Sequence, residues 1–401
     1  MARHKMLLSF LLLLSVLMLC THGMAESEAE DITNDCLFTS NYKDTLFRLT
    51  DEKTKMHYEG RKGKPCWIEI ASPQGKTIEG IYMIWADHTS PVSLEVWDDA
   101  LGTFAVYDTV NQGIYLHEYL AIPETTSIRL SSTDDAGTIA LCEVNLLTGG
   151  TTPSWVQAWE PPCEDADILI LVAHPDDEYL FFGGAIPFYS MERGLHVAVA
   201  YMTCKDATRY HELLNGLWTA GVHEYPYLVG LIDKSASVKM STAYNQWDGV
   251  DHALDVVAQL LDAVNPNIVL TQDLGGEYGH GAHMAVADIC LRIIRDEERH
   301  LARRPLKLYL HLWDENPIQM DWTVPMTSAD GKTSLEIAAS AFKCHVSQQG
   351  YSVKMKNGKP YKFEVVAGGP LDNGKFGLAY SSVGEDSGIM DFTEHVLPKM
   401  R

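Results

Sequence analysis

The chain has 401 residues, of which 46% are hydrophobic and 21% are charged, and its formal net charge is −23. These proportions are typical of a globular protein that is long enough to bury a large core and to form more than one domain. The negative charge argues against nucleic acid and anionic membranes as partners, because both would repel the protein electrostatically.

The first residues have the pattern of a signal peptide. A basic segment, residues 1–6, precedes an apolar run from Leu7 to Cys20, and the segment Gly23-Met24-Ala25 that follows offers small residues at a cleavage site. The apolar run is shorter than the roughly 20 residues that a membrane-spanning helix needs. We therefore expect residues 1–25 to be removed on export, which leaves a secreted or extracytoplasmic chain without a membrane span. A retained membrane anchor is the alternative.

Between about Asp31 and Thr148 the sequence predicts an all-β domain. Short apolar runs alternate with turn residues, and this spacing is typical of a β-sandwich. Strands are expected at 66–70, 80–85, 92–97, 127–130 and 139–144. The Gly, Thr and Pro residues that follow predict a linker at 151–165.

Seven cysteines follow the predicted signal peptide. Export would permit disulfides, and Cys36 with Cys66, or Cys142 with Cys163, are possible pairs between which the sequence does not decide. Two others, Cys204 and Cys290, lie in apolar surroundings and are expected to be core thiols.

After the linker, strand-like segments alternate with helix-like ones, which predicts an α/β domain with a parallel, Rossmann-like sheet. The chain lacks a Gly-x-Gly-x-x-Gly motif after the first of these strands, so nothing in it indicates a bound dinucleotide. The expected strands are 167–173, 196–201 and 267–271, and the expected helices are 209–220, 252–264 and 284–297.

Two polar segments follow two of these strands. Residues 174–178 (His-Pro-Asp-Asp-Glu) follow the first strand, and residues 275–283 (Gly-Gly-Glu-Tyr-Gly-His-Gly-Ala-His) follow the strand at 267–271. Because ligands bind at the carboxyl ends of parallel strands, we expect these side chains to gather at one edge of the sheet. Histidines and a carboxylate with one open coordination position are typical of catalytic zinc. For either segment alone, a solvated loop with an incidental histidine is the alternative.

The same residue types suit amide hydrolysis. Zinc lowers the pKa of a bound water toward about 7 and can stabilise the developing oxyanion together with a donor such as His280. Asp176 can take the remaining proton of the water if it is not itself a metal ligand.

The two segments resemble the motifs of the LmbE-like or PIG-L family of zinc-dependent N-deacetylases. The resemblance includes residues 173–178, the Gly-His-x-x-His pattern at 279–283, Arg209-x-x-Glu212 and residues 345–348, and it extends over roughly residues 156–400. It implies a deacetylase domain at 166–401 that removes acetyl groups from N-acetylglucosamine-type sugars or glycans with Zn²⁺ as its cofactor.

The resemblance also implies roles for individual residues. His174, Asp177 and His283 match the family's zinc ligands. Asp176 matches the general base of the reaction.

Three further residues match substrate-handling positions of the family. His280 and Tyr278 match side chains that polarise the carbonyl group or serve the leaving amine, and Arg209 matches a position that contacts the substrate. The sequence departs from the family pattern at two places. Gly281-Ala282 stands where relatives have Pro-Asp, and Cys204-Lys205-Asp206 stands where relatives often have a Gly-rich turn. These departures leave the spacing of the predicted ligands intact but put the shape of the loop and of the substrate pocket in doubt.

The all-β region, residues 26–150, resembles a discoidin-like, galactose-binding-type domain. The resemblance rests on the loop Leu49-Thr50-Asp51, the segment Trp67-Ile68-Glu69-Ile70 and the late segment Ile128-Arg129-Leu130. Such modules often bind glycans, so this domain is expected either to tether the enzyme to an extended substrate or to pack as a structural partner.

Three functions follow from these patterns. The first is a secreted zinc deacetylase that acts on an N-acetylated sugar or glycan. The second is a zinc amidohydrolase with the same scaffold that acts on another small amide or on a cell-wall fragment. The third is a non-catalytic carbohydrate-binding protein, against which the complete set of candidate catalytic residues argues. The sequence does not indicate an oligomeric state.

Overall fold

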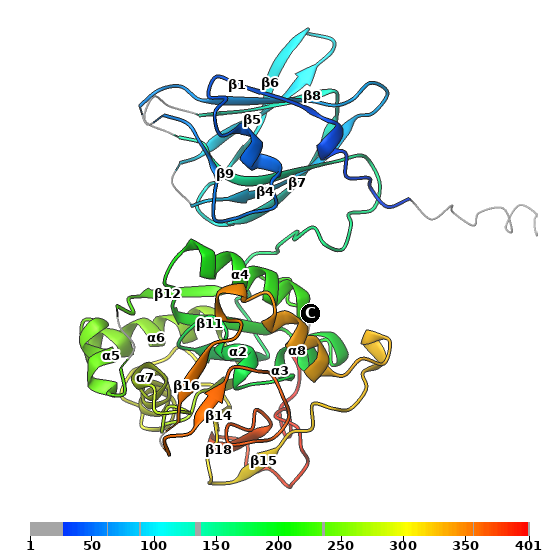
Figure 1. Cartoon of the computed structure of the whole chain (residues 1–401). Helices are drawn as coiled ribbons and strands as arrows, with labels where there is room; N and C mark the ends of the chain where they lie inside the picture. The colour runs from blue at the N-terminus through cyan, green and yellow to red at the C-terminus, as the bar shows by residue number, and fades with distance from the viewer. Residues whose placement is uncertain are drawn as a thin grey trace, which may run out of the picture. The chain divides into compact units, whose positions relative to one another are not determined.

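A computed structural model describes residues 27–61, 63–87, 90–132, 138–234, 237–355 and 357–399. The predicted signal peptide lies outside these ranges. Within them, no helix is both long and apolar enough to cross a membrane. The chain divides into two compact units (Figure 1). The first contains the described residues up to Gln157 except Tyr115–His117, and the second contains those three residues and the chain from Ala158 onward.

The first unit consists of two β-sheets. A five-stranded sheet has the order β1-β3-β8-β5-β6 with antiparallel neighbours throughout, and a four-stranded sheet has the order β2-β9-β4-β7. The strands are β1 (Leu37–Ser40), β2 (Tyr58–Glu59), β3 (Trp67–Ala71), β4 (Ile78–Trp85), β5 (Val92–Asp98), β6 (Thr103–Val110), β7 (His117–Thr125), β8 (Ser127–Ser132) and β9 (Ala140–Leu147). Two 3₁₀ turns, Thr33–Asp35 and Leu46–Thr50, precede β1 and β2 respectively.

Alternating burial explains why these strands form a two-sheet domain. In β3, Ile68 and Ile70 are fully buried, whereas Trp67 and Glu69 are half-buried. Because successive side chains of a strand point to opposite faces, one face of the sheet forms the core and the other meets solvent. The prediction of an all-β, sandwich-like region is confirmed.

The sequence prediction missed four strands of this unit: β1, β2, β6 and β7. Strand β6 is mostly exposed, with only its last residue fully buried, so it lacks the alternating pattern by which strands are recognised. Strand β7 contains Pro123, a residue that is disfavoured within strands.

Each of the two tryptophans in the predicted linker, 151–165, packs within one unit. The Trp155 ring contacts Tyr82 in the first unit, with the ring centroids 6.1 Å apart. The Trp159 ring contacts Trp218 in the second unit at 5.2 Å.

The second unit contains a seven-stranded mixed sheet in the order β12-β11-β10-β13-β14-β18-β15. The first five strands in this order are parallel, and β18 runs antiparallel to both β14 and β15. A separate hairpin pairs β16 with β17. The strands are β10 (Ile168–Val172), β11 (Val197–Thr203), β12 (Tyr227–Leu231), β13 (Ile268–Thr271), β14 (Lys307–His311), β15 (Pro317–Gln319), β16 (Ser352–Lys354), β17 (Pro360–Lys362) and β18 (Lys375–Ser381).

Helices form two groups around this sheet (Figure 1). One group consists of α5, α6 and α7, and the other consists of α2, α3, α4 and α8. The helices are α2 (Asp177–Leu180), α3 (Ala185–Pro187), α4 (Ala207–Thr219), α5 (Met240–Gln246), α6 (Val250–Val264), α7 (Gly281–Cys290) and α8 (Ser334–Phe342). Helix α7 continues as a π-helical turn, Leu291–Arg295.

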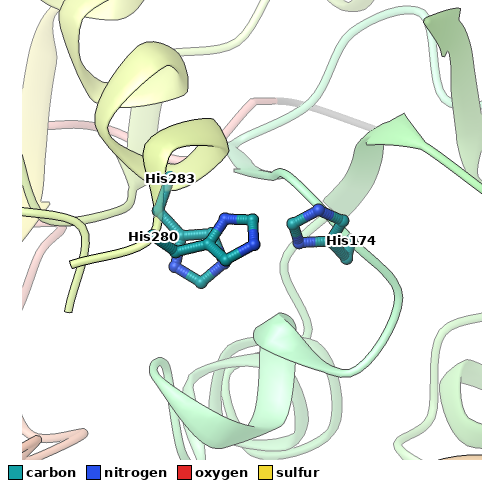
Figure 2. Close-up of side chains that lie close together, drawn as sticks. All are labelled: His174, His280 and His283. Atoms are coloured by element: carbon teal, nitrogen blue, oxygen red, sulfur yellow. The ribbon is translucent and has the colours of Figure 1, made fainter. Parts of the chain in front are cut away.

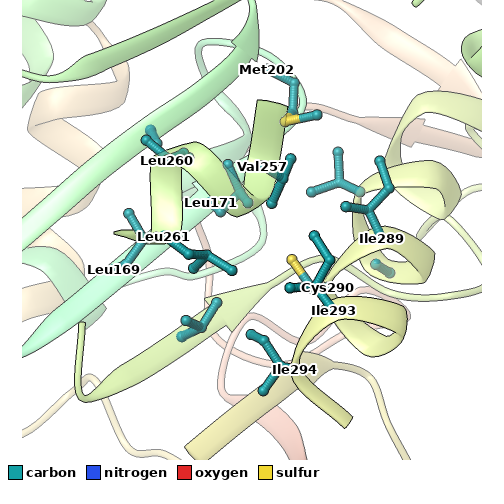
Figure 3. Close-up of a cluster of buried hydrophobic side chains, with 14 of the residues drawn as sticks. Leu169, Leu171, Met202, Val257, Leu260, Leu261, Ile289, Cys290, Ile293 and Ile294 are labelled. Carbon is teal, nitrogen blue, oxygen red and sulfur yellow. The ribbon is translucent and has the colours of Figure 1, made fainter. Parts of the chain in front are cut away.

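The core between the sheet and the first helix group positions the strands. All five residues of β10 are buried, as expected for a strand with helices on both faces. Leu169 and Leu171 of β10 lie in the same apolar cluster as Val257 and Leu261, which are one turn apart on α6 (Figure 3). The predicted α/β fold with a parallel sheet is confirmed.

The strand order contains a switch point beside β10. The chain runs from β10 to β11 on one side and later reaches β13 on the other side. In open α/β sheets, ligands bind at the carboxyl ends of the strands that flank such a point. The two polar segments recognised in the sequence follow β10 and β13, so the fold makes them neighbours.

The seven cysteines within the described residues are free thiols. Neither of the two disulfides that the sequence left open is therefore formed. Cys66 lies beside the Tyr58 hydroxyl at 3.2 Å, and the Cys142 thiol donates to the carbonyl oxygen of Thr54 at 3.4 Å. Cys290 is buried as expected, whereas Cys204 is partly exposed.

Candidate active site

Three imidazole rings meet at the carboxyl ends of β10 and β13 (Figure 2). His174 follows β10, His280 is the N-cap of α7, and His283 lies in the first turn of that helix. One nitrogen from each ring lies within 4.8 Å of the nitrogens of the other two. Segments that are distant in sequence thus form a cluster that can hold a metal ion.

Asp177 joins this cluster. Its Oδ2 atom lies 3.3 Å from His174 Nδ1 and 3.4 Å from His283 Nε2. The same oxygen accepts hydrogen bonds from the His174 backbone N–H at 2.9 Å and from Gln272 Nε2 at 3.0 Å. Burial disfavours the carboxylate, but the neighbouring His283 and His174 hold the pKa of Asp177 below its usual value. The fold therefore brings the three predicted zinc ligands together, with His280 beside them.

The environment of His283 suits a metal ligand. Its Nδ1 atom lies 2.6 Å from Glu277 Oε2, and both side chains are fully buried. Its Nε2 atom is also buried but makes no hydrogen bond, and it faces Asp177. A buried polar atom without a partner is costly, and a carboxylate on the far ring nitrogen is the usual support of a ligating histidine. The donor set of imidazoles and one carboxylate fits Zn²⁺.

Glu277 contacts the predicted ligand His283 on the side of its Nδ1 atom. The sequence interpretation missed this residue. Its Oε1 atom lies 3.1 Å from His311 Nδ1 and accepts the backbone N–H of Asp273 at 2.8 Å. Burial opposes its charge, but the neighbouring His283 and His311 hold its pKa below the usual value. The one signal in the sequence was its position in the segment 275–283.

Replacing Glu277 with glutamine is expected to weaken zinc binding by about 10–100-fold, because the amide cannot support the basicity of His283 as a carboxylate does. Competition with a chelator of known affinity measures the change. Glu143→Gln, at a buried glutamate of the first unit, serves as the control and should leave the affinity unchanged. Equal affinities in the two variants would contradict the supporting role of Glu277.

The contacts of Asp176 are with residues other than the predicted ligands. Its Oδ1 atom lies 3.0 Å from Arg209 Nη2, and the same guanidinium donates to the carbonyl oxygen of Pro175. Its backbone N–H donates to Glu178 Oε2 at 2.7 Å. The backbone φ angle of 110° is costly for a residue with a side chain, and such strain persists where surrounding contacts enforce it. Burial raises the pKa of Asp176 to about 7 although Arg209 opposes the shift.

His280 and Tyr278 are positioned as hydrogen-bond donors. Burial and the neighbouring imidazoles of His283 and His174 lower the pKa of His280 to about 3, so its ring is neutral at pH 7. Because His280 Nδ1 accepts the backbone N–H of Ala282 at 3.3 Å, we assign the ring proton to Nε2. Burial raises the pKa of Tyr278 above its usual value, so its hydroxyl stays protonated.

Each of the two ring nitrogens of His174 lies beside a carboxylate. Its Nε2 atom lies 3.0 Å from Oδ2 of Asp233, a residue that the sequence interpretation missed and that lies just beyond β12. Burial disfavours the charged ring, but Asp177 and Asp233 outweigh it and raise the pKa of His174 to about 10. The metal-free ring therefore carries a proton at pH 7, which a metal ion must displace.

Zinc affinity is expected to rise with pH. A proton on His174 competes with the metal, and the raised pKa means that the competition persists across the range from pH 6 to pH 8. For one displaced proton the apparent affinity rises about tenfold per pH unit. Calorimetric titration in buffers of different ionisation enthalpy reports the released proton. A pH-independent affinity without proton release would show that His174 is not a ligand.

A cavity of about 380 Å³ opens onto these side chains. A larger hollow, of about 710 Å³, lies near Pro161 and Arg303 but lacks the clustered histidines. Of the predicted site residues, all but His283 line the smaller cavity: His174, Asp176, Asp177, Arg209, Tyr278 and His280.

The structure explains the two departures from the family pattern. A Cβ atom on Gly281 would lie 2.4 Å from the carbonyl oxygen of Lys239, so a residue with a side chain does not fit without a shift of backbone. The Gly281 N–H donates to the carbonyl oxygen of Ser237 at 2.5 Å. In the other departure, Asp206 caps helix α4 by accepting the backbone N–H of Arg209 at 3.1 Å.

Comparison with known proteins locates the family within the second unit. Residues 169–294 match the profile of the family described as GlcNAc-PI de-N-acetylase (PIG-L). The chain is 26% identical over 155 residues to the 1D-myo-inositol 2-acetamido-2-deoxy-alpha-D-glucopyranoside deacetylase of Thermobifida fusca, which covers 32% of this chain and 54% of that protein. For a deacetylase of the same description from Catenulispora acidiphila the identity is 25% over 152 residues, 31% of this chain and 47% of that protein. The chain thus spans about half the length of these relatives.

Solved structures also resemble parts of the chain. A conserved protein from Thermus thermophilus matches with a TM-score of 0.34 and 17% identity over 46% of this chain and 80% of its own. The F5/8 type C domain of a Bacteroides fragilis protein matches with a TM-score of 0.25 and 13% identity over 31% of this chain and 97% of its own. The sequence match contains both polar segments, and residues 169–294 therefore belong to the PIG-L family.

Proposed function

We propose that this protein is a secreted, zinc-dependent N-deacetylase that removes acetyl groups from N-acetylglucosamine-type sugars or glycans. The observation that carries the proposal is the convergence of His174, Asp177 and His283, with a buried Nε2 atom on His283 that faces Asp177 and makes no hydrogen bond. A separate buried carboxylate, that of Asp176, lines the same cavity and is available for proton transfer.

His174, Asp177 and His283 would hold the metal. Zn²⁺, when bound, lowers the pKa of a water molecule and polarises the carbonyl group of the acetyl amide. Asp176 accepts the proton of the attacking water at its carboxylate, and the contact with Arg209 keeps that carboxylate in place.

The remaining residues handle the charge that develops on the substrate. The neutral His280 ring donates from Nε2 to the carbonyl oxygen as it becomes an oxyanion, and Tyr278 supplies a second hydroxyl donor from the same cavity wall. When the C–N bond breaks, Asp176 returns its proton to the leaving nitrogen. The products are acetate and a free amine.

Two further observations support the proposed substrate class and the proposed secretion of the protein. The relatives' printed names describe removal of an acetyl group from an N-acetylated glucosamine unit, which favours a sugar amide over another small amide or a cell-wall fragment. The signal-peptide pattern of residues 1–25 supports secretion. We further propose the division into a discoidin-like domain at 26–150, a linker at 151–165 and a deacetylase domain at 166–401.

An acetate-release screen tests the proposal. The purified protein is incubated with N-acetylated sugars, oligosaccharides and simple N-acetyl amides, before and after treatment with a chelator. We expect release from N-acetylglucosamine-type substrates, loss of release with the chelator, and recovery on adding Zn²⁺. Release from simple amides alone would favour the broader amidohydrolase. Saturable sugar binding without release by the zinc-loaded protein would favour a non-catalytic binding protein.

A further inference from the structure

One wall of the cavity comes from the C-terminal part of the chain. The hairpin β16–β17 and its flanks place Tyr351, Val353 and Phe363 in the lining of the same cavity as His174 and Asp176. This wall lies outside the segment that matches the family. It is therefore a feature that the family match does not explain.

The wall extends the aromatic surface of the catalytic site. The ring centroid of Phe363 lies 6.2 Å from that of Tyr278 and 5.5 Å from that of Tyr351. Phe363 is buried, whereas Tyr351 is 54% exposed and thus leaves much of its side chain open to solvent. A row of rings leads from the predicted reaction site to an exposed ring at the edge of the cavity.

Hydrogen bonds fix the backbone that carries this exposed ring. The backbone of Tyr351 donates to the carbonyl oxygen of Gln348 at 3.2 Å and accepts the N–H of Phe363 at 3.0 Å. Just before it, the backbone N–H and the hydroxyl of Ser347 donate to Glu212 of helix α4 at 2.7 and 2.6 Å. Because this backbone is already ordered, a ligand that binds the ring has less chain to immobilise than it would on a mobile loop.

The cavity that this wall lines also has polar residues. Gln348 and the exposed lysines Lys205 and Lys234 line the same cavity. An aromatic face bordered by hydrogen-bonding groups fits a ligand with one apolar face and polar edges. A pyranose ring has this character, because its C–H bonds form the faces and its hydroxyl groups form the edges.

We propose that Tyr351, with Phe363 and Val353 behind it, forms a subsite for a second pyranose ring that is linked to the sugar undergoing deacetylation. The inference rests on the proposed function, since it takes the reacting sugar to lie beside His174 and Asp176. It makes the natural substrate an oligosaccharide or a glycoside with a second ring, and not a free monosaccharide.

Equilibrium binding tests the subsite without turnover. Calorimetry on the full zinc-loaded chain carrying Asp176→Asn compares N-acetylglucosamine with its 1,3-, 1,4- and 1,6-linked disaccharides. We expect at least one disaccharide to bind about tenfold more tightly than the monosaccharide, a gain near the upper end for an aromatic contact. Tyr351→Ala should abolish the gain and Tyr351→Phe should keep it. Lys362→Ala, at an exposed position on β17, controls for damage to the hairpin and should also keep it.

Kinetics on the chain with Asp176 intact separate a subsite from a structural role. Tyr351→Ala should raise KM for the preferred disaccharide about tenfold and leave kcat and the monosaccharide kinetics nearly unchanged. Equal affinities for the monosaccharide and the disaccharides would overturn the subsite. An equal loss of kcat/KM on the monosaccharide and on the disaccharide in Tyr351→Ala would also overturn it. If the protein binds the disaccharide more tightly but releases no acetate, the subsite is supported and the proposed function is contradicted.

Discussion

The Asp176→Asn variant is expected to bind zinc normally and to turn over at least about 10²-fold more slowly than the unchanged protein. Asparagine keeps the size of the side chain but cannot accept a proton from the attacking water. Zinc should remain because Asp176 Oδ1 contacts Arg209, whereas the metal-facing oxygen belongs to Asp177. Metal analysis and acetate release on the same preparation measure both effects.

A second variant controls for the loss of a carboxylate as such. Asp288→Asn removes the carboxylate that lies beside the Tyr244 hydroxyl, five residues after His283 on helix α7 and outside the lining of the cavity. It should keep nearly full turnover. Near-normal turnover in Asp176→Asn itself would assign proton transfer to another group, and His280 would be the next candidate.

The His283→Ala variant is expected to lose stoichiometric zinc and with it the deacetylase activity. Removal of the ring deletes the Nε2 atom that makes no hydrogen bond, and it leaves Glu277 without its closest partner. Loss of a supporting carboxylate costs about 10–100-fold in metal affinity, so loss of a ligand should cost more than about 100-fold. Elemental analysis after dialysis and a chelator competition measure the change.

Two further variants make this result specific. His174→Ala removes a ligand from the other segment and should give the same loss. His252→Ala removes an exposed histidine of helix α6 and should retain one zinc per chain. Thermal unfolding of each metal-free variant shows whether it is folded. Full zinc occupancy in folded His283→Ala and His174→Ala would remove the basis of the metal assignment.

Much of the second unit could be predicted from sequence because its signals are local. The apolar run that became β10 is buried on both faces, and the spacing of Leu254, Val257 and Leu261 predicts the buried side of α6. The predicted elements of this unit are present with ends shifted by a few residues. In the first unit, β6 was missed because an exposed edge strand has no alternation of burial.

By itself the sequence determined which residue types follow β10 and β13, and hence the candidate ligands and the base. Only the tertiary structure decided that β10 and β13 are neighbours, that Asp176 pairs with Arg209, and that Glu277 bridges His283 and His311. The reason is physical: strand order and side-chain pairing depend on packing between segments far apart in the chain. Such contacts leave no periodic pattern within any one segment.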